Sequence, residues 1–164
     1  MRRSHETTQS YAMKILDVLS REAICADLKS ADKKGILEEL ASPVAEVADV
    51  SRDEIIRVLM ERERLGSTGI GGGIGIPHGK LKELQTLFLG FGLSRAGVDF
   101  ESLDGKPTHI FFLLLTPENS TGLHLKVLAR ISRILKNELL KEKLLAAATP
   151  EEIYTIIKEE DEDF

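Results

Sequence analysis

Hydrophobic residues recur every three or four positions in several parts of the chain, which is the spacing of one face of an α-helix. Ser51 and Glu54 form a capping-box pair at the start of one such stripe, and Pro150 suits a first helical turn. Pro43 is expected to interrupt or restart a helix. The pattern predicts helices over 11–19, from Ser30, from Ser51, from Asn119, over 139–147 and from Pro150.

The middle of the chain has a different pattern, with short apolar or alternating runs bounded by turn residues. Thr108–Leu115 is apolar on both faces, which predicts a central strand in a sheet covered on both sides. Helices bracket this group of strands. We therefore predict a single α/β domain whose mixed sheet of about five strands is flanked by helices on both sides. The predicted strands are 23–28, 74–76, 86–93, 98–100 and 108–115.

Composition narrows the classes of protein that the chain can represent. Its 164 residues, 42% of them hydrophobic, suffice for one core and exclude a fully disordered protein. The formal net charge of -5 equals the five acidic residues at 159–163, so the remainder has no basic surplus for nucleic acid. We expect a disordered N-terminal extension over 1–10, a folded domain over 11–158 and a solvated acidic tail over 159–164.

Cys25 is the only cysteine, so neither an intrachain disulfide nor a cysteine-based zinc site can form. The single thiol fits a reducing compartment. The sequence shows no signal peptide, and its conspicuous apolar run, 110–115, is far shorter than the ~20 residues that span a bilayer. We expect a cytoplasmic protein without membrane insertion.

A glycine-rich segment carries the candidate chemistry. Seven of the fifteen residues from Gly66 to Lys80 are glycine, a density that a helix cannot tolerate, so we expect a loop. The segment does not match a phosphate-binding Walker A loop or a dinucleotide fingerprint. The chain also lacks metal-ligand spacing of histidines and carboxylates. No nucleotide, metal or other cofactor is expected.

Within this segment His78 stands between Pro77, which restricts the backbone, and Gly79, which we expect to leave room for a large partner. Such a histidine can act as a base, a metal ligand or a nucleophile. A neutral imidazole can attack a phosphoryl group and form a phosphohistidine.

The surrounding residues suit a phosphoryl group. Backbone N–H groups of Gly66–Gly73, the hydroxyls of Ser67 and Thr68, and the guanidinium of Arg62 are candidate donors to an anion. His124, in the first turn of its predicted helix, is a candidate second group. His109 and His5 are expected to be structural or unrelated to the site.

These residues resemble a known family. Arg62-Glu63, the run Gly66–Gly71, the run Gly73–Lys80 and His124-Leu125 are similar to the enzyme IIA domain of the bacterial sugar phosphotransferase system. The similarity is to its fructose, mannitol and nitrogen-regulatory class. It extends over about residues 15–158.

The resemblance implies that His78 takes a phosphoryl group on Nε2 from the phosphocarrier HPr and passes it to a cysteine on a IIB domain. Arg62 and His124 look like the pair that stabilises the phosphate. The loop residues implied are Ser67, Thr68, Gly69 and Gly79. No cofactor is implied.

The unbroken run Gly66–Gly71 and the sequence after His78 resemble the nitrogen-regulatory members most, which signal through partner proteins. A stand-alone fructose-type IIA for sugar uptake is the first alternative. A protein-docking module that uses Ile70, Ile74 and Ile76 is the second, and a small hydrolase with a histidine base is the weakest. The family pattern has Asn where this chain has Gly72, which predicts a more flexible loop.

Overall fold

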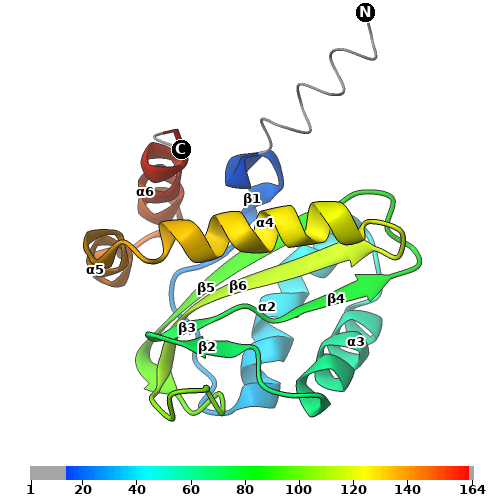
Figure 1. Cartoon of the computed structure of the whole chain (residues 1–164), viewed down its shortest axis with the longest axis horizontal. Coiled ribbons are helices and arrows are strands. Elements are labelled where there is room, and N and C mark those ends of the chain that lie inside the picture. The colour runs from blue at the N-terminus through cyan, green and yellow to red at the C-terminus, as the bar shows by residue number, and fades with distance from the viewer. Residues whose placement is uncertain (1–13, 163–164) are drawn as a thin grey trace, which may run out of the picture.

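The structure, a computed structural model, describes residues 14–162. Its helical elements are η1 (Ile15–Asp17), a 3-10 turn, and the α-helices α2 (Lys33–Ala48), α3 (Arg52–Arg64), α4 (Thr121–Ile134), α5 (Glu138–Ala146) and α6 (Pro150–Glu162) (Figure 1). Its strands are β1 (Leu19–Cys25), β2 (Gly69–Gly71), β3 (Ile74–Gly75), β4 (His78–Leu81), β5 (Phe88–Val98) and β6 (Thr108–Pro117).

All the strands belong to one mixed sheet with the order β1-β5-β6-β3-β2, and β4 also pairs with β6. β1 lies parallel to β5, whereas β5 and β6 are antiparallel. β3 and β4 are both parallel to β6: β3 pairs at Ile110 and Phe111, and β4 pairs from Leu114 onward. Pro77 lies between these two short strands, and its carbonyl accepts a hydrogen bond from Leu114 N at 2.9 Å.

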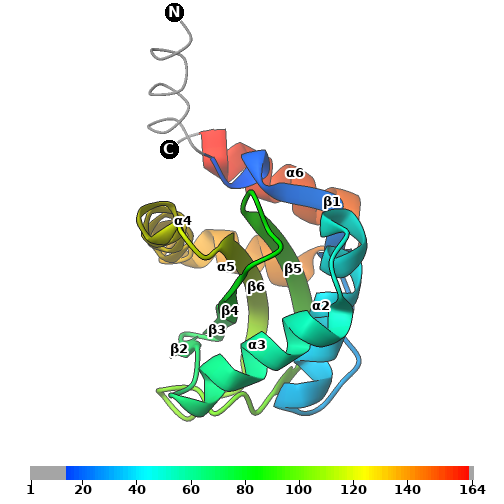
Figure 2. The same ribbon diagram turned by 90° about the vertical axis from the view of Figure 1, so that its right-hand side faces the viewer.

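Helices cover both faces of the sheet, as the sequence predicts (Figure 2). Alternate residues of β6 face opposite layers because strand side chains have a period of two. Ile110, Phe112 and Leu114 pack in the core with α4, α5 and α6. Phe111, Leu113 and Leu115 pack in a second core with α2 and α3. The prediction that this strand is central and covered on both faces is confirmed.

Several predicted boundaries are wrong. α2 runs without interruption through Pro43, because its apolar face, from Ile36 to Val44, is buried on both sides of the proline and outweighs the lost hydrogen bond. The predicted helix over 11–19 is reduced to η1, and residues 11–13 lie outside the described residues. No separate strand forms over 98–100, since β5 extends to Val98.

The acidic end of the chain also differs from expectation. α6 continues through Glu162, and the Asp161 side chain, 1% exposed, forms an ion pair with Arg130 of α4 at 2.8 Å. Asp161 also accepts a hydrogen bond from Leu16 N at 3.2 Å. The prediction of a solvated, disordered tail is therefore wrong for residues 159–162, while the predicted extension over 1–10 lies outside the described residues. Within residues 14–162, no helix combines the length and apolar character needed to cross a membrane.

Candidate functional site

His78 is the first residue of β4 and not part of a loop, because its backbone pairs with Leu114 of β6. The sequence missed this strand because it is short and contains a glycine. Nδ1 of His78 lies 2.8 Å from the carbonyl oxygen of Ile76. A carbonyl can only accept, so Nδ1 carries the proton and Nε2 retains the lone pair. This is the tautomer that attack through Nε2 requires.

His124 of α4 lies beside His78. The ring centroids are 5.1 Å apart, and the ring planes meet at 72°. His124 is buried, and its Nδ1 lies 3.5 Å from the hydroxyl oxygen of Thr116 at the end of β6. The start of α4 therefore brings the second predicted histidine to the first, although 46 positions separate them in the sequence.

Arg62 lies in the last turn of α3, next to the start of the glycine-rich segment. Its Nη1 donates a hydrogen bond to the carbonyl of Gly66 at 2.8 Å, which ties the guanidinium to the start of the glycine-rich segment. The side chain is near enough to His78 for its charge to lower the pKa of that imidazole. The two histidines from β4 and α4 are therefore in contact, and the charge of Arg62 on the last turn of α3 acts on His78.

The surroundings of both imidazoles favour the neutral form, because they lower the pKa of each ring. Burial lowers the pKa of His78; the hydrogen bond to Ile76 opposes this, the charge of Arg62 adds to it, and that of Glu63 opposes it. Burial also lowers the pKa of His124; the charge of Lys80, and that of His78 whenever its imidazole is protonated, lower it further. A neutral His78 has its Nε2 lone pair available near neutral pH.

The loop hydroxyls have partners within the fold. Ser67 donates to the carbonyl of Phe100 at 2.7 Å and accepts from Gly69 N at 3.0 Å. The buried Thr68 donates its hydroxyl hydrogen to the carboxylate of Glu63. These bonds direct both hydroxyls toward the protein, so their role in the structure is to shape the segment before His78.

Gly79 does not provide open space beside His78, which corrects our interpretation of that residue. A Cβ built on Gly79 would lie 2.4 Å from Cγ1 of Val58 on α3. The glycine is therefore needed for the close packing of α3 against β4. Gly69 is similarly enclosed, since its Cβ would lie 3.0 Å from the Cα of Ser102.

The glycine hairpin between β2 and β3 is tied to its neighbours. Gly72 has a φ of +67°, in the left-handed region that Asn tolerates better than most residues. Its N–H donates to Asp104 at 3.0 Å, and its carbonyl accepts from Lys141 Nζ at 3.3 Å. Both the N–H and the carbonyl of Gly72 thus have hydrogen-bond partners in this hairpin.

Glu63 is the residue near the site to which the sequence analysis assigned no role. Its carboxylate is buried and accepts hydrogen bonds from Thr68 and from Lys33 of α2. A signal was present in the helical pattern, because Glu63 follows the buried Ile55 and Leu59 by eight and four positions and so lies on the apolar face of α3.

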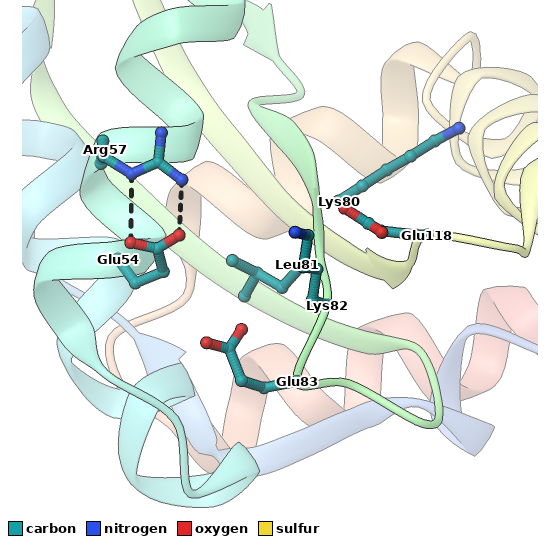
Figure 3. Close-up of a pocket in the computed structure, with 7 residues that line it drawn as sticks. All are labelled: Glu54, Arg57, Lys80, Leu81, Lys82, Glu83 and Glu118. Atoms are coloured by element: carbon teal, nitrogen blue, oxygen red, sulfur yellow. Dashed lines mark hydrogen bonds and ion pairs between the residues drawn. The ribbon is translucent and has the colours of Figure 1, made fainter.

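A charged hollow of about 160 Å³ lies at the other end of β4. In Figure 3, Arg57 faces Glu54 within it, and the Lys80 side chain extends away from that pair. Arg62, His78 and His124 do not line this hollow, so it is separate from the candidate site. In the described part of the chain, no group of three or more His, Cys, Asp or Glu side chains is arranged to hold a metal ion.

Comparisons with known proteins give a consistent result. The model of a family described as phosphoenolpyruvate-dependent sugar phosphotransferase system, EIIA 2, matches residues 17–160. A nitrogen regulatory protein of Bradyrhizobium diazoefficiens is 42% identical over 145 residues, which cover 88% of this chain and 95% of that protein. The fructose-specific EIIABC component of Bacillus subtilis is 34% identical over 150 residues, which are 91% of this chain and 24% of that relative. The crystal structure of the nitrogen regulatory protein IIA-Ntr from Neisseria meningitidis has a TM-score of 0.81 at 33% identity, covering 86% of this chain and 97% of that one.

Proposed function

Because the chain belongs to the EIIA 2 family of the phosphoenolpyruvate-dependent sugar phosphotransferase system, we propose that it carries a phosphoryl group on Nε2 of His78. The phosphoryl donor is an HPr-type phosphocarrier protein. The observation that carries this proposal is the hydrogen bond from His78 Nδ1 to the Ile76 carbonyl, at 2.8 Å. It leaves Nε2 as the nucleophilic nitrogen beside a second histidine and an arginine.

The transfer exchanges one N–P bond for another. Nε2 of His78 forms a bond to phosphorus while the bond between phosphorus and the imidazole nitrogen of the donor breaks, and the electron pair of that bond stays on the donor nitrogen. Such a step needs positioning and charge stabilisation more than further covalent chemistry. The side chains of His78, Arg62 and His124 therefore suffice for the transfer in this proposal.

Arg62 and His124 stabilise the phosphoryl oxygens in this proposal. The guanidinium of Arg62 offers several N–H donors in one plane, and its bond to the Gly66 carbonyl orients that plane. The arrival of a dianionic group beside His124 favours the imidazolium form, which raises the pKa of His124 in the phosphorylated protein. His124 then donates to the phosphoryl group as a cation.

The destination of the phosphoryl group distinguishes two branches of the family. The relative from Bradyrhizobium diazoefficiens, 42% identical and of similar length, favours a regulatory role in which the phosphorylation state controls binding to target proteins. The fructose-specific relative, 34% identical, favours the second candidate, a IIA that passes the group to a cysteine of a IIB domain for sugar uptake.

Intact mass spectrometry tests the carrier role. The chain is incubated with phosphoenolpyruvate, enzyme I and a cognate HPr, beside His78→Ala and the control His109→Ala. We expect one phosphoryl group on the parent and on the control, and none on His78→Ala. An unmodified parent in a tube that contains phosphorylated HPr would refute the proposal and favour a docking module.

A second arm separates the branches. The phosphorylated protein is mixed with a fructose-type IIB domain, and the loss of the phosphoryl group from His78 is followed over time. Rapid transfer to the IIB cysteine supports sugar uptake. Retention of the group supports the regulatory branch.

A further inference from the structure

Glu63 is a buried carboxylate for which the proposed transfer has no direct use. Its side chain is 3% exposed and lies one residue after Arg62 on α3. Burying a carboxylate is costly unless it is paired and hydrogen-bonded, so its surroundings must compensate. They do so through three donors: one from Lys33, 30 positions earlier in the sequence, and two from Thr68, five positions later.

The first compensating group is Lys33, near the start of α2. Its Nζ lies 2.9 Å from Oε1 of Glu63 and 2.9 Å from Oε1 of Glu101. Burial alone would lower the pKa of Lys33, but these two bonds outweigh it and raise that pKa. Lys33 therefore stays charged and forms a close ion pair with the Glu63 carboxylate.

The other two donors belong to Thr68. Its N–H donates to Oε1 of Glu63 at 3.2 Å, and its hydroxyl donates to Oε2. One carboxylate thus binds both the backbone and the side chain of this residue. This double attachment restrains the position and orientation of Thr68 within the glycine-rich segment, where the backbone is otherwise permissive.

From Thr68 the restraint reaches His78 in two further bonds. The carbonyl of Thr68 accepts from Ile76 N at 3.0 Å, and the carbonyl of Ile76 accepts from His78 Nδ1 at 2.8 Å. The carbonyl of Ile76 sets the tautomer of His78, and the N–H of the same residue is bound to Thr68. Pro77, the residue between Ile76 and His78, stiffens the last step.

We propose that Glu63, braced by Lys33, is the positioning residue for His78, acting through Thr68 and Ile76 to keep Nε2 unprotonated and aimed at the phosphoryl donor. This inference rests on the proposed function, because it concerns the histidine that accepts the phosphoryl group. Glu63 does not contact the phosphoryl group in this scheme. Its effect is on the orientation and tautomer of the nucleophile.

Two substitutions of Glu63 separate positioning from charge. Glu63→Ala removes the attachment to Thr68. Glu63→Gln removes the charge but can keep both bonds, because the amide oxygen accepts from Thr68 N–H and the amide NH₂ donates to the Thr68 hydroxyl oxygen. Glu101→Ala is the matched control, since it removes the other, exposed partner of Lys33 without touching Thr68.

Two readouts are measured on each protein: the rate of phosphoryl acceptance from phosphorylated HPr, and the ¹⁵N chemical shifts of the His78 ring, which report the tautomer without any phosphoryl donor. For Glu63→Ala we expect acceptance slowed by about 10- to 100-fold, the scale of losing a supporting partner or of a small misplacement. We also expect a mixed tautomer. Glu63→Gln and Glu101→Ala are expected to keep most of the parent rate and the Nδ1–H tautomer.

Parent-like rate and tautomer in Glu63→Ala would overturn the inference. Equal losses in Glu63→Ala and Glu63→Gln would also overturn it, because the charge and not the position would then matter. If Glu63→Ala does not fold, Thr68→Val decides, since it removes only the hydroxyl link; an unchanged tautomer and rate there would count against the relay. Failure of the parent to accept a phosphoryl group would instead refute the proposed function, and the ring shifts distinguish the two failures.

Discussion

Gly79 packs closely against Val58, so the effect of Gly79→Ala on stability is expected to depend on which residue occupies position 58. A Cβ on Gly79 would lie 2.4 Å from Val58 Cγ1, whereas carbon atoms in favourable contact are about 3.5–4.0 Å apart. Val58 cannot easily turn aside, because a β-branched side chain in a helix has one strongly preferred rotamer. Gly79→Ala is therefore expected to destabilise the fold by about 1–3 kcal/mol, the range for overpacked cores.

When the Cγ1 methyl of Val58 is removed, Gly79→Ala is no longer expected to destabilise the fold. In Val58→Ala the nearest remaining atom of residue 58 is its Cβ, 3.6 Å from the Cβ built on Gly79, which is an ordinary contact. The φ of Gly79 is not in the left-handed region, so alanine fits its backbone. Alanine also reduces the conformational entropy of the unfolded chain, a stabilisation of about 0.4–1 kcal/mol. In this background Gly79→Ala is expected to be neutral or stabilising.

Urea unfolding of the four proteins, followed by far-ultraviolet circular dichroism, measures this double-mutant cycle. The expected coupling free energy between positions 58 and 79 is about 1–4 kcal/mol, the difference between the effects of Gly79→Ala in the two backgrounds. A coupling below about 0.5 kcal/mol, the level of independent sites, would refute the packing argument. Displacement of α3 would also displace Arg62, which this helix carries. Gly79→Ala should therefore accept phosphoryl groups more slowly than the parent, and the addition of Val58→Ala should restore the rate.

Three further expectations concern the ion pair of α6 and the histidines. Asp161→Ala should destabilise the fold by about 1–3 kcal/mol in urea unfolding, because it removes the buried carboxylate that pairs with Arg130 and accepts a hydrogen bond from Leu16 N. The exposed Glu159→Ala should change the stability by less than about 0.5 kcal/mol. Burial lowers the pKa of His78 and of His124 in the folded protein. As the pH falls through the ordinary value of about 6.5, the unfolded chain therefore binds more protons than the folded one, and the free energy of unfolding should decrease. Folded pKa values at or above about 6.5 in an NMR titration would contradict this expectation. His109→Ala loses the hydrogen bond from Nδ1 to a main-chain carbonyl of β5 and should cost about 1–3 kcal/mol while one phosphoryl group is still incorporated, as unfolding and mass spectrometry will show.

The elements predicted correctly are those whose signal is local. The apolar run of β6 predicted a strand covered on both faces, and the capping pair at Ser51 predicted the start of α3, where Ser51 Oγ accepts from Glu54 N at 3.2 Å. Both signals depend on residues within a few positions of one another. The same is true of α6, whose first residue is Pro150.

The errors occur where distant contacts outweigh local preference. β2 and β4 form from glycine-containing segments because β3 and β6 offer their hydrogen bonds. α2 passes through Pro43 because its apolar face is buried along the whole helix. Asp161 is buried because Arg130, 31 positions earlier, pairs with it.

For the site, the sequence alone determined which residue types are present around His78 and which family they resemble. Only the tertiary structure decided that His124 lies 5.1 Å from His78, that Ile76 selects the tautomer, and that Gly79 serves the packing of α3. The physical reason is that hydrophobic periodicity records which face of an element is buried. It does not record which atoms of other elements lie opposite that face, and those atoms set the tautomer, the pKa and the approach to the nucleophile.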